Sequence, residues 1–325
     1  MSGSGKTRPW AGAALALLLL LYPFIFTGPF FWDIGVAFLL AAVSASAWNI
    51  LGGYAGQVSV GHAMFFGIGA YVPLLVFQHW ALPPIAGVPV AMALSVILAM
   101  IVGTPTFRLQ GHYFSMATIA VAELIRLLVG TWDFLGAAIG LQGPAVGRGW
   151  WDLTFRSELP YYYMFLGVLA LLLGITYAMQ RSRFGYYLRA IKASERAARS
   201  LGVAVRQVKL RALMLSAAFT SVAGSLYSIK TGFIDPDSGF GILVSVQMVI
   251  VAALGGAGTL AGPLVGALIL VPLQTATNTW FGGGGSGLTY ILYGGIIVVL
   301  ARFEPGGLHE LWHRIASRLR LRHAA

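Results

Sequence analysis

Long apolar runs separated by short polar segments dominate the chain. A hydrocarbon core about 30 Å thick needs roughly 20 apolar residues per helix, and runs of about this length predict ten membrane spans. Their residue ranges are 10–26, 34–51, 62–80, 85–107, 113–129, 161–180, 212–229, 243–257, 260–278 and 288–301. The pattern therefore predicts an all-α protein, a polytopic transmembrane helix bundle of about ten spans.

One long charged segment, residues 181–211, divides the apolar runs. It holds nine lysines and arginines against the single acid Glu195, and short loops rich in Lys and Arg stay on the cytoplasmic side. We expect a first bundle of about six spans at 1–180, this cytoplasmic loop, a second bundle of about four spans at 212–301, and a cytoplasmic amphipathic tail at 302–325. Even span numbers on both sides of the loop place both termini in the cytoplasm.

Within this loop, residues 187–201 have the spacing of an amphipathic helix. If the segment is helical, its basic residues form one stripe, namely Arg189, Lys192, Arg196 and Arg199. The opposite face carries small and apolar residues, including Ala190, Ala197 and Ala198, and Gly202 follows as a candidate helix C-cap. Two interpretations remain open: a helix that docks on a partner, and a basic helix that lies on anionic lipid headgroups.

Composition agrees with a membrane protein. The chain is 58% hydrophobic and 10% charged, whereas soluble domains carry roughly 25% charged residues. The net charge of +11 comes from basic residues at the ends of apolar runs, which favours membrane orientation over nucleic-acid binding. The absence of cysteine excludes disulfides and thiolate metal ligands, and the histidines lack metal-ligand spacing. We expect no bound metal or cofactor.

Two glycine-rich segments interrupt the helical pattern. The first, residues 52–71, carries Gln57, Ser59 and His62 near the expected start of a helix. Irregular backbone at membrane depth occurs against protein or beside a water-filled path, so these three residues are candidates for a translocation path. The alternative is a tight turn with close helix packing by the glycines. A second break, residues 254–268, occupies a comparable place in the second bundle, as expected for an internal repeat.

Two opposite charges, Glu123 and Arg126, lie three residues apart inside a predicted span. Each charge alone would cost roughly 2.5–3.5 kcal/mol on insertion scales, so we expect the two side chains to pair and to face the bundle. The pair is either a polar feature of the translocation path or an internal ion pair that fixes helix packing.

Three stretches resemble the LivM-type membrane permeases of branched-chain amino acid ABC importers, and the resemblance covers nearly the whole chain. They are GYAGQVSVGHAMFFGIGAY, TIAVAELIRLL, and FGYYLRAIKASERAARSLGVAVRQVKLRAL followed by AFTSVAGSLYS. The resemblance implies that the charged loop contains a cytoplasmic coupling helix, with Glu195, Ala197, Ala198 and Gly202 in contact with an ATPase subunit. The chain departs from the general importer pattern E-A-A-x-x-x-G, which would place its glutamate at the position of Arg196. The family's Thr-Gly-Gly segment after the fifth span is also absent.

The resemblance further implies a complex in a bacterial cytoplasmic (inner) membrane. Its other members would be a second homologous permease, ABC ATPase subunits that use ATP, and a periplasmic or lipid-tethered substrate-binding protein. The solute would be leucine, isoleucine or valine, or alternatively urea, an amide or another amino acid. Two other classes, an ion-coupled secondary transporter and a membrane-embedded enzyme, are less favoured. The spans bury few acids for an ion relay and show no catalytic constellation.

Overall fold

The computed structural model describes residues 9–109, 111–144, 149, 152–281, 291 and 294–295. The predicted tail at 302–325 lies outside these residues, as does nearly all of the predicted span at 288–301.

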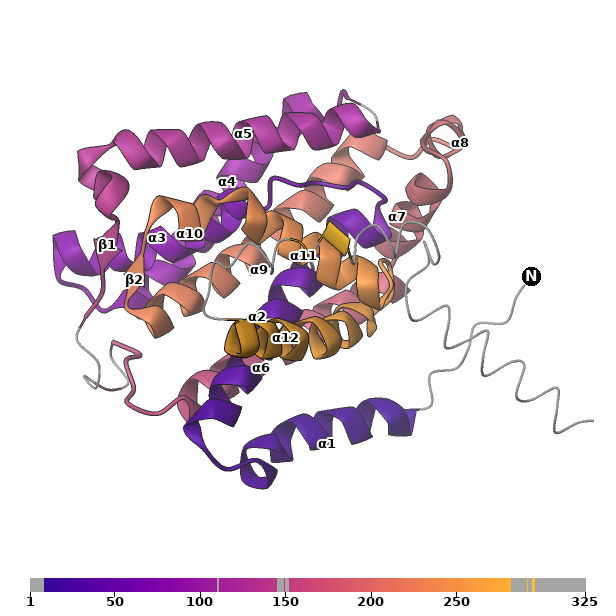
Figure 1. The fold of residues 1–325 in the computed structure, drawn as a ribbon. Helices are drawn as coiled ribbons and strands as arrows, with labels where there is room; N and C mark the ends of the chain where they lie inside the picture. The colour runs from indigo at the N-terminus through magenta and orange to yellow at the C-terminus, as the bar shows by residue number, and fades with distance from the viewer. Residues whose placement is uncertain are drawn as a thin grey trace, which may run out of the picture.

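The described residues form a bundle of α-helices (Figure 1). The helices are α1 (Pro9–Ile25), α2 (Pro29–Asn49), α3 (Ala63–Trp80), α4 (Pro84–Thr106), α5 (His112–Thr131), α6 (Leu159–Arg181), α7 (Arg183–Ala193), α8 (Glu195–Ser200), α9 (Val205–Thr231), α10 (Pro236–Phe240), α11 (Ile242–Gly255) and α12 (Gly262–Phe281). A π-helix, η1 (Ile50–Tyr54), continues α2, and two short 3₁₀ turns follow α5, namely η2 (Asp133–Leu135) and η3 (Ala137–Ile139). Two-residue strands, β1 (Leu141–Gln142) and β2 (Phe233–Ile234), pair antiparallel.

Seven segments of the described chain are helical, long and apolar enough to cross a membrane. They are α2 with η1, then α3, α4, α5, α6 and α9, and finally α10 with α11. The predicted all-α, multi-pass class is thus confirmed. The count of about ten spans stays a prediction, because α1 has 17 residues and α12 is not among the seven.

The helices α2, α3 and α9 form the buried centre of the bundle. Helix α9 packs against α3, α4 and α2, so the residues assigned to the first and second bundles by sequence lie together in space. Helices α4, α5 and α6 are mostly exposed, and their exposed side chains include Leu94, Ile101 and Leu127. Apolar residues on an outer surface are expected where a helix faces lipid.

Glycines bring the backbones of α3 and α9 into direct contact. A methyl group added at Gly69 of α3 would lie 2.0 Å from the carbonyl oxygen of Ser221, and one at Gly224 of α9 would lie 2.0 Å from that of Phe66. Small residues at helix crossings allow this close approach in membrane bundles. The packing interpretation of the first glycine-rich segment therefore holds at Gly69.

The charged segment contains two helices rather than the single helix predicted at 187–201. Ser194 has extended backbone angles, and its hydroxyl accepts a hydrogen bond from the amide of Ala197 at 3.3 Å. Serine favours such a cap over a helix interior, which explains the break between α7 and α8. Helix α9 begins at Val205, so the last residues of the predicted loop at 181–211 are helical. Figure 1 shows α7 and α8, which together are called the elbow below, at one end of the bundle.

Candidate functional site

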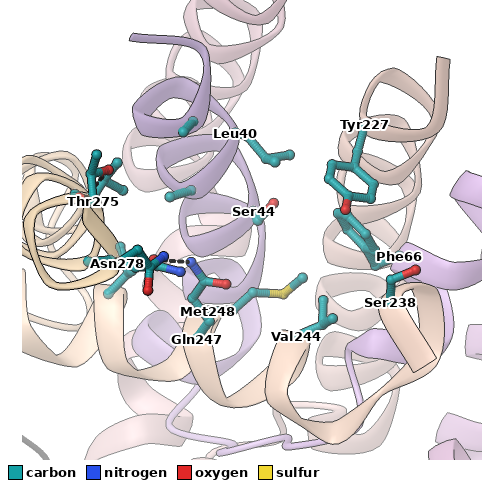
Figure 2. Close-up of a pocket in the computed structure, with 15 residues that line it drawn as sticks. Leu40, Ser44, Phe66, Tyr227, Ser238, Val244, Gln247, Met248, Thr275 and Asn278 are labelled. Atoms are coloured by element: carbon teal, nitrogen blue, oxygen red, sulfur yellow. Dashed lines mark hydrogen bonds between the residues drawn. The ribbon is translucent and has the colours of Figure 1, made fainter. Parts of the chain in front are cut away.

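A cavity of about 260 Å³ lies among α2, α3 and α9 to α12. It is lined by Ala37, Leu40, Ala41, Ser44, Phe66, Tyr227, Ser238, Val244, Gln247, Met248, Val251, Val271, Gln274, Thr275 and Asn278. Pockets for drug-sized ligands span about 300–1,000 Å³, so this smaller cavity suits a small solute. Figure 2 shows side chains from the central helices and from α11 and α12 around it.

The cavity wall is apolar with a few neutral polar groups. The Ser44 hydroxyl is buried and has no hydrogen-bond partner among the described residues. The Gln247 amide donates to the side-chain oxygen of Gln274 over a long 3.4 Å (Figure 2). Within the described part of the chain, the residues that line the cavity carry no charged side chain. Because a net charge would be poorly solvated here, the cavity suits a neutral or zwitterionic solute with an apolar part.

His62 and Ser59 lie outside this cavity in a closed hydrogen-bond network. The His62 ring is fully buried, with Nδ1 at 3.0 Å from the Ser59 hydroxyl and Nε2 at 2.8 Å from that of Ser216. Ser216 donates to the carbonyl of Ala47 at 2.6 Å, so its oxygen accepts from Nε2–H and Nδ1 accepts from Ser59. This tautomer leaves His62 neutral and satisfied, and the geometry fits a residue that joins helices.

Gln57 and Glu195, predicted for different roles, contact each other. The Gln57 amide donates to the Glu195 carboxylate at 3.1 Å, and the same carboxylate oxygen pairs with the Lys209 ammonium of α9. The Lys209 side chain is only 1% exposed, so its charge depends on this partner. The cluster fastens the first turn of α8 to α9 and to the first glycine-rich segment.

Glu123 and Arg126 form the predicted ion pair, with a shortest distance of 2.5 Å. Arg126 also reaches Asp237 of α10 at 2.5 Å. The Glu123 side chain is 43% exposed and the Arg126 side chain 26% exposed, so whether the pair faces the translocation path stays a prediction. Neither residue lines the cavity. The ion pair of Arg126 with Asp237 links α5 to α10.

The two glycine-rich breaks lie side by side. The side chain of Asn49, at the end of α2, accepts from the amide of Gly258 at 2.8 Å and donates to the carbonyl of Thr259 at 2.9 Å. Asn49 is 2% exposed. The Asn49 side chain thus pairs two backbone groups of the second break, and unpaired backbone groups inside the bundle would cost free energy. These hydrogen bonds join the end of α2, just before the first break, to the second break.

The four residues expected to couple to an ATPase are arranged in two groups. Ala197 and Gly202 are exposed, and Gly202 has a φ of +83°, as expected of a helix stop. Ala198 is 2% exposed and packs in the core of this chain, while Glu195 is held by Lys209. Leu201, beside Gly202, is 84% exposed. A partner that meets α8 in this arrangement would touch Ala197, Leu201 and Gly202, and would not reach Ala198.

Sequence reasoning missed the cavity and the residue that joins the breaks. Ser44, Gln247 and Gln274 are polar residues inside apolar runs, and Asn49 closes such a run. Polar side chains in spans usually face the bundle interior, which is a signal that could have selected them. Among the described residues, no group of three or more His, Cys, Asp or Glu side chains could hold a metal ion.

A multi-pass helix bundle with a small cavity lined by neutral side chains is compatible with a membrane permease. The chain matches the family described as "Branched-chain amino acid transport system / permease component" over residues 12–301, and it belongs to that family. The resemblance to LivM-type permeases is therefore confirmed.

Individual relatives agree with this assignment. The chain is 27% identical to the high-affinity branched-chain amino acid transport system permease protein LivM of Escherichia coli K12, over 91% of this chain and 73% of that protein. It is 23% identical to the permease protein BraD of Pseudomonas aeruginosa, over 82% of this chain and 90% of that protein. A probable LivH of Methanocaldococcus jannaschii is 24% identical over 72% of this chain and 75% of that protein. No solved structure matches the chain significantly.

Proposed function

We propose that this chain and a second homologous permease form the translocation path for leucine, isoleucine and valine in an ABC importer. The family match over residues 12–301 carries this proposal. Partner ATPase subunits would supply the energy from ATP, and a periplasmic or lipid-tethered binding protein would deliver the solute. The chain would lie in a bacterial inner membrane with about ten spans and both termini in the cytoplasm.

The exposed surface of α8 is proposed as the contact with the ATPase subunit. Its support is the exposure of Ala197, Leu201 and Gly202 at one end of the bundle, beside basic residues that favour the cytoplasmic side. The contact of Glu195 with Lys209 and Gln57 would pass a movement of α8 to α9 and to the first glycine-rich segment. A packed helix connected in this way can switch between discrete positions.

The cavity of about 260 Å³ is proposed as this chain's part of the path. Ser44 and Gln247 offer neutral hydrogen-bonding groups, and Leu40, Val244 and Val251 offer apolar surface for a branched side chain. The lining residues come from the middle of α2 and from the half of α12 far from Gly262, so in the proposed orientation the cavity lies between the membrane centre and the periplasmic side. A solute released by the binding protein would enter there.

Replacing Gln247 by leucine is expected to reduce leucine uptake by about five- to tenfold, since one neutral hydrogen bond is worth about 0.5–1.5 kcal/mol. The measurement is the uptake rate of labelled leucine at saturating concentration, in cells that lack the native permease but contain its partner subunits. Gln78→Leu, at an exposed position near the end of α3, is the matched control and should transport normally. Unchanged uptake in both Gln247→Leu and Ser44→Ala would contradict a path through this cavity. Uptake of urea but not leucine would contradict the amino-acid assignment.

A further inference from the structure

A second cavity, of about 250 Å³, lies between the elbow and the two glycine-rich breaks. Its wall combines Gly53 and Tyr54 from η1, Gly258 from the second break, and residues from the end of α6 and from α7. The charged residues in this wall are both cations, Arg189 and Lys192. The cavity thus differs from the neutral cavity described above in both place and charge.

The groups that face this cavity offer more donors than acceptors. The Lys192 ammonium has no hydrogen-bond or ion-pair partner among the described residues, and burial lowers its pKa below the ordinary lysine value. The Arg189 guanidinium uses Nε and one terminal nitrogen for the carbonyls of Gly185 and Gln180 at 3.4 and 2.7 Å. The guanidinium also lies over the Tyr186 ring, with its Cζ 4.6 Å from the ring centroid, and its other terminal nitrogen has no hydrogen-bond partner within the described chain. The Tyr54 hydroxyl accepts from the Gln180 amide, which leaves its own proton free to donate.

The Lys192 side chain is exposed, and it lies close to both glycine-rich breaks. A methyl group added at Gly258 would lie 2.7 Å from the Lys192 Nζ, and one added at Gly56 would lie 3.2 Å from its Cγ. The stem of the lysine therefore lies over the first break while its ammonium reaches the second. The Lys192 ammonium is partly shielded from water at this position. An anion beside it would stabilise its charge by replacing the lost hydration.

From this arrangement we infer that the cavity binds a phosphate group, held by Lys192, Arg189 and the Tyr54 hydroxyl. A phosphate offers several acceptor oxygens, which matches three converging donors better than a single carboxylate oxygen would. Its source is either the headgroup of an anionic lipid or a free phosphate, since basic pockets between helices at the cytoplasmic side of a membrane bind lipid phosphates. The bound group would fasten α7 to both glycine-rich breaks.

The test measures binding of labelled phosphatidylglycerol to the full chain, purified in neutral detergent, with phosphatidylcholine as the comparison lipid. We expect saturable binding of phosphatidylglycerol alone and about a fivefold loss of affinity in Lys192→Met, as for the removal of one cation near a lipid surface. Lys192→Arg should keep most of the binding. The matched control is Arg183→Met, which removes a charge from the same helix outside the cavity and should bind like the unchanged protein.

Competition separates the two sources of phosphate. Displacement of the label by millimolar inorganic phosphate would support a site for free phosphate, and displacement by phosphatidic acid alone would support a lipid site. Equal binding by Lys192→Met and the unchanged chain would overturn the inference, and so would an equal loss in Arg183→Met. Normal lipid binding in Lys192→Met, together with loss of copurifying ATPase subunit, would instead assign the cavity to an acidic partner side chain. The lipid-binding readouts require neither transport nor a partner subunit, so a failure of this inference is distinguishable from a failure of the proposed function.

Discussion

Replacement of Glu195 by alanine is expected to destabilise the folded protein by about 3 kcal/mol. The Lys209 side chain that this carboxylate neutralises is only 1% exposed, and breaking one partner of a buried ion pair costs about 3–5 kcal/mol. The lower end applies because Glu195 itself is 25% exposed. The measurement is thermal or denaturant-induced unfolding of the purified chain in detergent.

A double replacement separates the ion pair from general damage at the elbow. Glu195→Leu combined with Lys209→Met removes both charges and leaves no buried cation, so it should be less destabilised than Glu195→Ala alone. Gln57→Leu, which removes only the neutral hydrogen bond to the same carboxylate, should cost about 1 kcal/mol. If the Glu195 and Lys209 effects were simply additive, the role assigned to this pair would be wrong.

Replacement of Gly69 by alanine is expected to open the contact between α3 and α9 and to reduce the yield of folded protein. The added methyl would lie 2.0 Å from the Ser221 carbonyl oxygen and 2.7 Å from the Ser221 Cα, so a backbone rather than a flexible side chain must move. Overpacking usually costs about 1–3 kcal/mol, occasionally more, and both helices belong to the buried centre. Unfolding midpoints and the monodisperse fraction after purification measure the effect.

Gly174 of α6 provides the matched control, because a methyl group added there meets nothing within 4 Å. Alanine is the better helix former by about 1 kcal/mol, so Gly174→Ala should leave stability unchanged or slightly raised. Gly69→Ala should therefore lower the stability of the folded protein, whereas Gly174→Ala should not. Equal stability of both variants would contradict the direct backbone contact between α3 and α9.

The class of fold was accessible from sequence, because apolar runs of span length leave few alternatives in a membrane. Nine of the ten predicted runs overlap α1 to α6, α9, α11 and α12, and nearly all of the tenth lies outside the described residues. The hydrophobic periodicity gave a wrong prediction at the elbow. It indicated one helix through 187–201, whereas Ser194 ends α7 and caps the start of α8. It also failed at the start of α9, because Lys209 looks like a loop residue until its tertiary partner Glu195 is known.

The sites were harder to predict than the spans. Gln57, Ser59 and His62 were selected because polar residues beside glycines often line a path, yet the structure uses His62 to join helices and Gln57 to hold Glu195. The cavity residues Ser44, Gln247 and Gln274 come together only through the packing of α2, α11 and α12. Spacing along the chain cannot show such a junction, because it depends on contacts between distant segments.

In the proposed function, this chain carries branched-chain amino acids only as part of an ATP-driven complex. The most direct measurement is uptake of labelled leucine into proteoliposomes that contain this permease, its second permease and the ATPase subunits, with the binding protein and leucine outside and ATP inside. We expect accumulation with ATP, none with a non-hydrolysable analogue, and none when the ATPase subunits are omitted. Leucine accumulation by this chain alone on a proton or sodium gradient would contradict the account.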